Sequence, residues 1–188
     1  METRIECQAS KTQCDRLRND YAALDRRMID SLKPVKDAVS GLAVKPPPGY
    51  LAHVASAAAA QEAVITVTKP NEAGTVCRVV FKPLPLPPGT TQEVLNSASG
   101  NYKEGLSAYF EVLTVERFEH AGVRGATILG ISKKNPQQPN WAPDLPARIY
   151  SFYTPKGHTS VTCWADKTLF DARQPAFEAI ARALTLPR

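Results

Sequence analysis

The chain has 188 residues and a mass of 20.5 kDa, enough for one compact domain with or without an appendage. Hydrophobic residues make up 43% of it and charged residues 22%, a composition that excludes a disordered chain, a collagen-like chain and a membrane-embedded protein. The net charge of +5 is not concentrated, and the densest basic clusters near the N-terminus are interleaved with aspartates. We therefore expect no nucleic-acid partner.

The first periodic segment lies between residues 11 and 33. Leu17, Tyr21, Leu24 and Met28 recur at spacings of four, three and four, which predicts an amphipathic helix with one apolar face. Pro34 disfavours helical geometry at the residue before it and ends the helix. The apolar face predicts either a helix docked on its own domain or a coiled-coil or partner-binding helix, and the small number of heptads favours docking.

Three consecutive prolines at 46–48 predict a stiff, extended connector. We place a boundary there, between an N-terminal helical extension over residues 1–45 and a domain over residues 46–188. The alanine-rich segment from Leu51 to Glu62 predicts a short helix. The longest uncharged stretch, 46–61, is shorter than the roughly 18 residues of a membrane helix, so we expect no integral membrane span. The first twenty residues are dense in charge, and we expect no signal peptide in the chain as given.

From residue 63 onward the pattern changes to alternation with period two, which is typical of strands. It predicts one hairpin over 63–68 and 75–82, a second over 110–119 and 124–132, and a third over 148–153 and 159–164. A capping box from Thr90 to Glu93 predicts a helix running toward residue 109. Asp171 with Gln174 predicts the cap of a closing helix, with Pro175 in its first turn. Because strands occur in adjacent pairs, the sequence predicts an α+β fold with helices packed on an antiparallel sheet.

The cysteines bear on the compartment of the protein. Cys7 and Cys14 can form a disulfide only if the chain turns between them, which a helix start at Ser10 or Thr12 would allow. Cys77 and Cys163 fall in predicted strands and could meet across a sheet or between core layers. Disulfides would favour an exported protein, and the alternative is buried free thiols. The four disulfide candidates are Cys7, Cys14, Cys77 and Cys163.

The common catalytic motifs are absent: there is no nucleophile elbow, phosphate-binding loop, dinucleotide-binding glycine loop or His-Glu-x-x-His. His158 and Cys163 form the sharpest candidate dyad, but five residues apart on one strand they face opposite sides of the sheet. Carboxylate pairs such as Glu116 and Glu119 have nothing that brings them to a shared cleft. No Cys/His cluster has metal-ligand spacing. We expect no catalytic residue, no cofactor and no metal.

A long loop over residues 133–147 contains four prolines and predicts no regular structure. Proline limits the entropy that such a loop loses on ordering, and tryptophan is enriched at protein interfaces. The loop therefore predicts a binding surface, and the alternative is that its tryptophan folds back onto the core. The candidate binding residues are Lys133, Lys134, Asn135, Trp141 and Asp144.

The run from Ala147 to Asp166, followed by the segment from Phe170 to Leu184, resembles the closing hairpin and helix of the PsbP-like superfamily, which includes DcrB-type bacterial envelope lipoproteins. Residues 87–110 and the strands after them are similar to its central part. The resemblance covers about residues 60–188 and leaves the helix at 11–33 outside it. It implies an antiparallel sheet between helices, an α/β/α sandwich, and a binding or adaptor role without catalytic residues.

These observations lead to one principal hypothesis and two alternatives. The principal hypothesis is a non-enzymatic protein-binding module of the bacterial cell envelope, an immunity or adaptor protein of a secretion system whose partner is another protein, such as a cognate secreted effector. The first alternative is a periplasmic carrier of a small hydrophobic ligand or lipid. The second is a hydrolase with unassigned carboxylates. The expected location is the periplasm or the envelope, with the cytoplasm as the alternative.

Overall fold

The computed structural model describes residues 10–31, 33–55, 62–72, 74–97, 102–134 and 144–188, with positions 23–31 described by their backbone. Seven strands form one sheet in the order β3-β4-β5-β9-β8-β7-β6, and every neighbouring pair is antiparallel. This confirms the predicted α+β class. The strands are β3 (Leu51–Ala55), β4 (Ala63–Thr68), β5 (Val76–Pro83), β6 (Phe110–His120), β7 (Val123–Ser132), β8 (Pro146–Thr154) and β9 (Gly157–Trp164).

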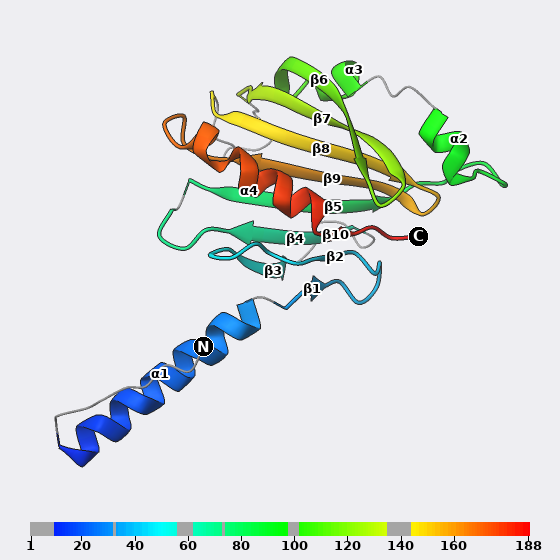
Figure 1. Cartoon of the computed structure of the whole chain (residues 1–188). Coiled ribbons are helices and arrows are strands. Elements are labelled where there is room, and N and C mark those ends of the chain that lie inside the picture. Colours follow the sequence, from blue (N-terminus) through cyan, green and yellow to red (C-terminus); the bar gives the residue numbers. More distant parts are fainter. Residues whose placement is uncertain (1–9, 32, 56–61, 73, 98–101, 135–143) are drawn as a thin grey trace.

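Helices lie on both faces of this sheet. The helix α4 (Phe170–Arg182) crosses one face, where its Phe177 and Ile180 pack into the main core (Figure 1). The short helix α3 (Tyr102–Leu106) packs against a second, smaller core. Ile149 belongs to the smaller core and its neighbour Tyr150 to the main core, because successive side chains of a strand point to opposite faces. The molecule is thus an α/β/α sandwich.

A cross-strand disulfide joins the central strands β5 and β9. Cys77 lies directly opposite Cys163 in the register, and the two sulfurs are bonded, with a Cα–Cα distance of 4.0 Å. Both residues are buried in the main core beneath α4. The sequence left open whether these cysteines meet across a sheet or between core layers. The strand register shows that they meet across neighbouring strands of one sheet.

A second, three-stranded sheet has the order β1-β2-β10 and consists of β1 (Val35–Lys36), β2 (Ala43–Val44) and β10 (Leu184–Thr185). β2 pairs with β1 and with β10 at the end of the chain. Leu42 and Val44 are fully buried in the main core. Residues that precede the connector at 46–48 therefore pack with the C-terminal strand, while the division into 1–45 and 46–188 stays a prediction.

The N-terminal helix α1 (Lys11–Ser31) begins directly after Ser10, which is one of the two helix starts that the sequence predicted. Gln13 accepts a hydrogen bond from the backbone N–H of Ser10, which closes the first turn. Figure 1 shows α1 directed away from the sheet, and Leu17 and Tyr21 are 41% and 48% exposed. Docking on the chain's own domain, the favoured interpretation of the apolar face, is therefore wrong for these two residues.

The prediction of an alanine-rich helix over 51–62 is wrong for the residues of this segment that the structure describes. Residues 51–55 form β3, which pairs with β4 from Leu51 opposite Thr68 to Ala55 opposite Val64, and residues 56–61 lie outside the described part of the chain. Pairing with the open edge of β4 supplies backbone hydrogen bonds in both segments. That tertiary gain outweighs the helix propensity of alanine, which is worth less than about 1 kcal/mol per residue.

Two helix starts also differ from prediction. The helix α2 (Gln92–Ser97) is capped by Thr91, whose Oγ1 accepts from the N–H of Val94 at 3.4 Å, so the cap lies one residue later than the predicted Thr90. α4 starts at Phe170 without a side-chain cap, which places Pro175 inside the helix and not in its first turn. Phe170 is buried against Phe177, with ring centroids 5.9 Å apart, and this packing accompanies a helix start that lies one residue before the predicted cap, Asp171.

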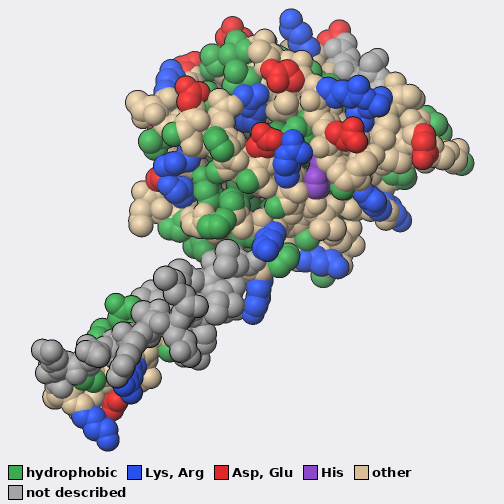
Figure 2. Space-filling view, in the orientation of Figure 1, with side chains coloured by type: hydrophobic (Ala, Val, Ile, Leu, Met, Phe, Trp, Pro, Cys, Tyr) green, Lys and Arg blue, Asp and Glu red, His purple; other side chains and the backbone are tan. Residues whose placement is uncertain are grey.

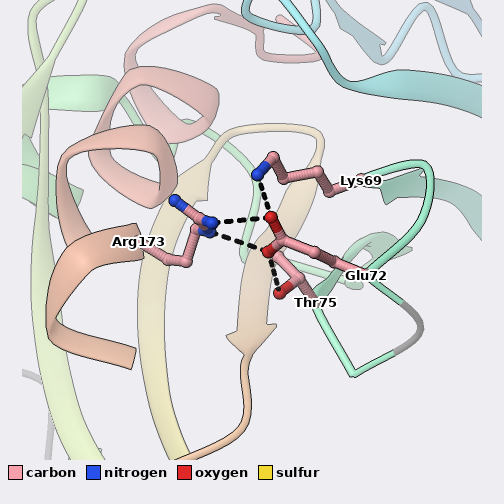
Figure 3. Close-up of polar contacts among 4 residues, drawn as sticks. All are labelled: Lys69, Glu72, Thr75 and Arg173. Atoms are coloured by element: carbon pink, nitrogen blue, oxygen red, sulfur yellow. Dashed lines mark hydrogen bonds and ion pairs between the residues drawn. The ribbon is translucent and has the colours of Figure 1, made fainter. Parts of the chain in front are cut away.

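A polar cluster ties the β4–β5 turn to α4 (Figure 3). Glu72 accepts hydrogen bonds from Arg173 Nε at 2.8 Å and Nη2 at 2.6 Å, and from Thr75 Oγ1 at 3.1 Å, and it also pairs with Lys69. The hydrogen bonds from Arg173, then from Lys69, lower the pKa of Glu72 to about 2. The cluster therefore fixes the start of α4 against the sheet while Glu72 is ionised.

Lys and Arg side chains are interspersed with Asp and Glu side chains on the molecular face that carries α4 (Figure 2). None of the helices in the described part of the chain is both long and apolar enough to cross a membrane.

Candidate functional site

A pocket of about 180 Å³ lies between α3 and the β8–β9 hairpin, and we refer to it as the α3 pocket. Its walls are largely apolar or aromatic, and hydroxyl and imidazole groups contribute the polar part. The lining residues are Tyr102, Gly105, Leu106, Ile149, Ser151, Tyr153, His158 and Ser160.

The register of the third predicted hairpin positions one wall of the pocket. β8 and β9 are joined at Pro155 and Lys156, so Tyr153 lies opposite His158 and Ser151 lies opposite Ser160. Paired residues of an antiparallel ladder point to the same face of the sheet. All four side chains therefore face α3, away from the disulfide and α4.

Short helices hold the opposite wall in place. α3 presents Tyr102 and Leu106, four residues apart on one helix face, to the sheet. α2 is attached to the hairpin because Gln92 Nε2 donates to the carbonyl oxygen of Tyr153 at 3.1 Å. Asn96 Oδ1 accepts from the N–H of Arg124 at 2.8 Å, which joins α2 to the β6–β7 hairpin as well.

The polar part of the pocket includes a hydrogen-bonding pair formed by Ser151, which is buried, and His158, which is half-buried. Ser151 Oγ and His158 Nε2 are 2.8 Å apart, and Ser151 is 5% exposed. The ring of Tyr153 stacks on the imidazole, with centroids 4.6 Å apart and an interplanar angle of 27°. Burial, followed by the nearby charge of Lys82, lowers the pKa of His158 to about 4. The imidazole is therefore neutral at physiological pH and belongs to the aromatic surface of the pocket.

A hydroxyl beside a neutral imidazole is half of a nucleophile–base arrangement. Such a site also needs a group that orients the imidazole and donors for the developing oxyanion. Among the described residues that line the pocket there is no carboxylate, and its floor is the pleated surface of a sheet. The arrangement is suited to holding an apolar or aromatic group with one hydrogen bond to Ser151 or Ser160.

His158 and Cys163 do not form a dyad, as their spacing predicted. His158 faces the α3 pocket, whereas Cys163 is bonded to Cys77 in the core on the opposite face. Cys14 lies on α1, and Cys7 lies outside the described residues, so their pairing stays a prediction.

The base of the predicted binding loop lies beside α3. The N–H of Lys133 donates to the carbonyl oxygen of Tyr109 at 2.8 Å, and its ammonium group donates to the carbonyl oxygen of Ser107 at 2.7 Å. The other end is fixed by Asp144, whose N–H donates to the carbonyl oxygen of Ser132 at 2.8 Å. The loop thus leaves and rejoins the domain next to the end of α3.

The remaining predicted binding residues are divided between exposed and undescribed positions. Lys134 and Asp144 are exposed, and Asp144 has a φ of 60°. Asn135 and Trp141 lie outside the described residues. Their assignment to a binding surface stays a prediction.

A second, more polar hollow of about 500 Å³ lies between α4 and strands β6 to β8. It contains carboxylates that the sequence did not place together, Glu116 from β6 and Asp171 and Glu178 from α4, along with Arg148 and Tyr150. Within the described part of the chain, however, no group of three or more His, Cys, Asp or Glu side chains could hold a metal ion.

Sequence reasoning missed the contribution of Ser151 and Tyr102 to a site. A usable signal existed, because a hairpin with its turn at 155–156 places Ser151 on the same face as His158. The wall formed by α3 had no comparable signal, since Gly100 and Gly105 made that helix weak in the sequence.

No protein-family model matches the chain, and no curated protein sequence matches it. A solved structure does: the solution structure of cyanobacterial PsbP (CyanoP) from Synechocystis sp. PCC 6803 superposes with a TM-score of 0.53. The match covers 83% of this chain and 92% of that chain. This chain has a PsbP-like fold. The sequence identity is 11%, so the likeness concerns the fold alone. It confirms the predicted PsbP-like architecture.

Proposed function

We propose that this chain is a non-enzymatic protein-binding module of the bacterial cell envelope, and that its binding surface consists of the α3 pocket and the base of the 133–146 loop. The observation that carries the proposal is their adjacency. Lys133 is bonded to the carbonyl groups of Ser107 and Tyr109, directly after the helix that forms one wall of the pocket. A partner that reaches the pocket would therefore also meet Lys133 at the base of the loop.

The volume of the pocket limits what it can hold. An apolar cavity of roughly 150 Å³ accommodates one benzene molecule. A pocket of about 180 Å³ therefore suits one aromatic ring or one large aliphatic side chain, and it is too small for the acyl chain of a lipid. An anchoring side chain of a partner protein fits this size, and such anchors dominate many protein interfaces. The size thus favours protein binding over lipid carriage.

Within this class we propose a DcrB-type role as an immunity or adaptor protein of a secretion system, with a secreted effector as partner. The Cys77–Cys163 disulfide supports location in the periplasm or envelope, because such bonds persist in oxidising compartments. The PsbP-like fold supports a binding role only by analogy, since a fold can host many functions.

Selection of phage-displayed peptides against the full chain tests the proposal. We expect enriched peptides to share one aromatic residue, and we expect Gly105→Phe to abolish their binding. A Cβ added at Gly105 meets no atom within 4 Å, so the backbone there can carry a side chain, and Gly105 lines the pocket that the ring is meant to fill. Lys103→Phe is the matched control, because it places the same ring on α3 at an exposed position outside the pocket lining.

Three results would contradict the proposal. Peptides that bind Gly105→Phe as well as the wild type would exclude the pocket from the interface. Binding of free indole without enrichment of any peptide would favour the carrier alternative. Hydrolysis of p-nitrophenyl acetate that Ser151→Ala abolishes would show that the Ser151–His158 pair is catalytic.

A further inference from the structure

We propose that α1 is a self-association helix that pairs with α1 of a second copy in antiparallel orientation. The structure motivates this because α1 carries exposed apolar residues away from its own domain. Leu17 and Tyr21 are 41% and 48% exposed, and α1 extends away from the seven-stranded sheet (Figure 1). A helix with one apolar stripe gains little from its own propensity and needs a partner for that stripe.

The stripe follows a heptad repeat. Leu17 and Leu24 occupy d positions, and Tyr21 and Met28 occupy a positions, at the spacing of four, three and four that a left-handed coiled coil requires. In an antiparallel pair each a residue meets a d residue of the other copy. One register satisfies this for all four residues at once, with Leu17 level with Met28 of the second copy and Tyr21 level with Leu24.

The charges beside the stripe decide the orientation. The e positions hold Arg18 and Asp25, and the g positions hold Asp20 and Arg27. Antiparallel helices bring e positions next to e positions and g positions next to g positions. In the register set by the apolar residues, Arg18 meets Asp25 of the second copy, and Asp20 meets Arg27. Two-fold symmetry doubles each pair, which gives four attractive contacts.

A parallel pair would reverse this balance. Parallel helices bring each g position next to the e position five residues later on the other copy. Asp20 would then meet Asp25 twice, and the two arginines would gain no acidic partner. The same helix is thus self-complementary in the antiparallel orientation and self-repelling in the parallel one.

Sedimentation equilibrium of the full chain, at concentrations up to about 0.1 mM and low salt, tests the proposal with Asp20→Arg. In the antiparallel pair this change replaces two attractions by two repulsions, each between the introduced guanidinium of one copy and Arg27 of the other. An exposed ion pair changes an equilibrium constant by roughly twofold, so the dimer dissociation constant should rise about 16-fold. In a parallel pair the same substitution would tighten the dimer, because position 20 would then face Asp25.

Two further variants complete the experiment. Asp20→Arg combined with Arg27→Asp should restore the wild-type dissociation constant. Asp15→Arg, at the outward b position, makes the same change of charge and should leave the constant within about twofold. A wild-type chain that stays monomeric at about 0.1 mM, a dimer tightened by Asp20→Arg, or an equal effect of Asp15→Arg would each overturn the proposal.

Discussion

Removal of the Cys77–Cys163 disulfide is the sharpest test of how this fold is stabilised. The perturbation is the double substitution Cys77→Ala and Cys163→Ala, which leaves the other cysteines intact, unlike treatment with a reductant. Alanine is preferable to serine because both positions are 0–1% exposed, and a serine hydroxyl there would be buried in an apolar core. The β5–β9 ladder runs from Val76 to Pro83, so backbone hydrogen bonds still pair these strands in the variant.

The magnitude follows from the length of chain that the disulfide closes. The two cysteines are separated by 86 residues. In the chain-entropy description, a crosslink over a loop of this length destabilises the unfolded state by about 4.5 kcal/mol, near the upper end of the range for natural disulfides. Each sulfur also fills space in the main core, which adds a smaller packing loss in the variant. We therefore expect the free energy of unfolding to fall by about 4–5 kcal/mol.

Urea denaturation followed by circular dichroism and by tryptophan fluorescence measures this loss. The midpoint should fall, and the slope with denaturant should rise, because the unfolded chain without the crosslink exposes more surface. A loss below about 1 kcal/mol would refute the reasoning, since it would mean that the crosslink does not constrain the unfolded chain as its loop length requires.

Four further predictions concern titration and close packing. Burial keeps the pKa of His158 at about 4 against 6.5 in the unfolded chain, so stability is fully present above pH 6.5 and should fall by roughly 3 kcal/mol as the pH drops to 4, measured by urea denaturation across that range. His158→Gln should flatten this window. The pKa of Glu72 is lowered from 4.5 to about 2, so its contribution is present above pH 4.5 and is lost as the pH falls toward 2, and Glu72→Gln should remove the slope in that lower window alone. Gly125→Ala should lower the free energy of unfolding by roughly 1–3 kcal/mol, because its Cβ would lie 2.2 Å from the carbonyl oxygen of Ser151. Gly105→Ala adds a Cβ that meets no atom within 4 Å, and it should raise the free energy of unfolding by up to about 1 kcal/mol. Urea denaturation measures both glycine variants.

The antiparallel sheet could be predicted from the sequence because its strands pair locally. All three predicted hairpins form, and the period-two pattern places the apolar residues of the first and third correctly. The pattern fails on β6, where the register shifts between Val112 and Thr114 and Val115 is exposed. The order of those hairpins was not available from local patterns. It depends on the pairing of β5 with β9, two strands far apart in the chain whose register is marked only by Cys77 and Cys163.

The failures share one physical cause, which is competition between local propensity and distant partners. The segment at 51–55 has helix-forming alanines, yet it pairs with β4 because the edge of that strand offers hydrogen bonds. α4 begins before its predicted cap because Phe170 finds a buried site against Phe177. The candidate site was missed for the same reason, since one of its walls comes from α3, a five-residue helix whose position is set by packing.

Alternation along β8 and β9 separates the stabilising face of the sheet from the candidate binding face. Cys163 faces the main core and α4, whereas His158 and Ser151 face α3. Pocket residues contribute little to the disulfide-linked core, so substitutions at the mouth of the pocket can change binding with small effects on unfolding. The Ser151–His158 pair is the exception, because desolvation of the imidazole links the interior of the pocket to the stability of the whole domain. If the pocket admits a partner's ring only beside a neutral imidazole, folding will weaken as the pH falls below 6.5, whereas binding to the folded chain will weaken only as the pH approaches 4, where its imidazole takes up a proton. His158→Gln will remove both dependences together.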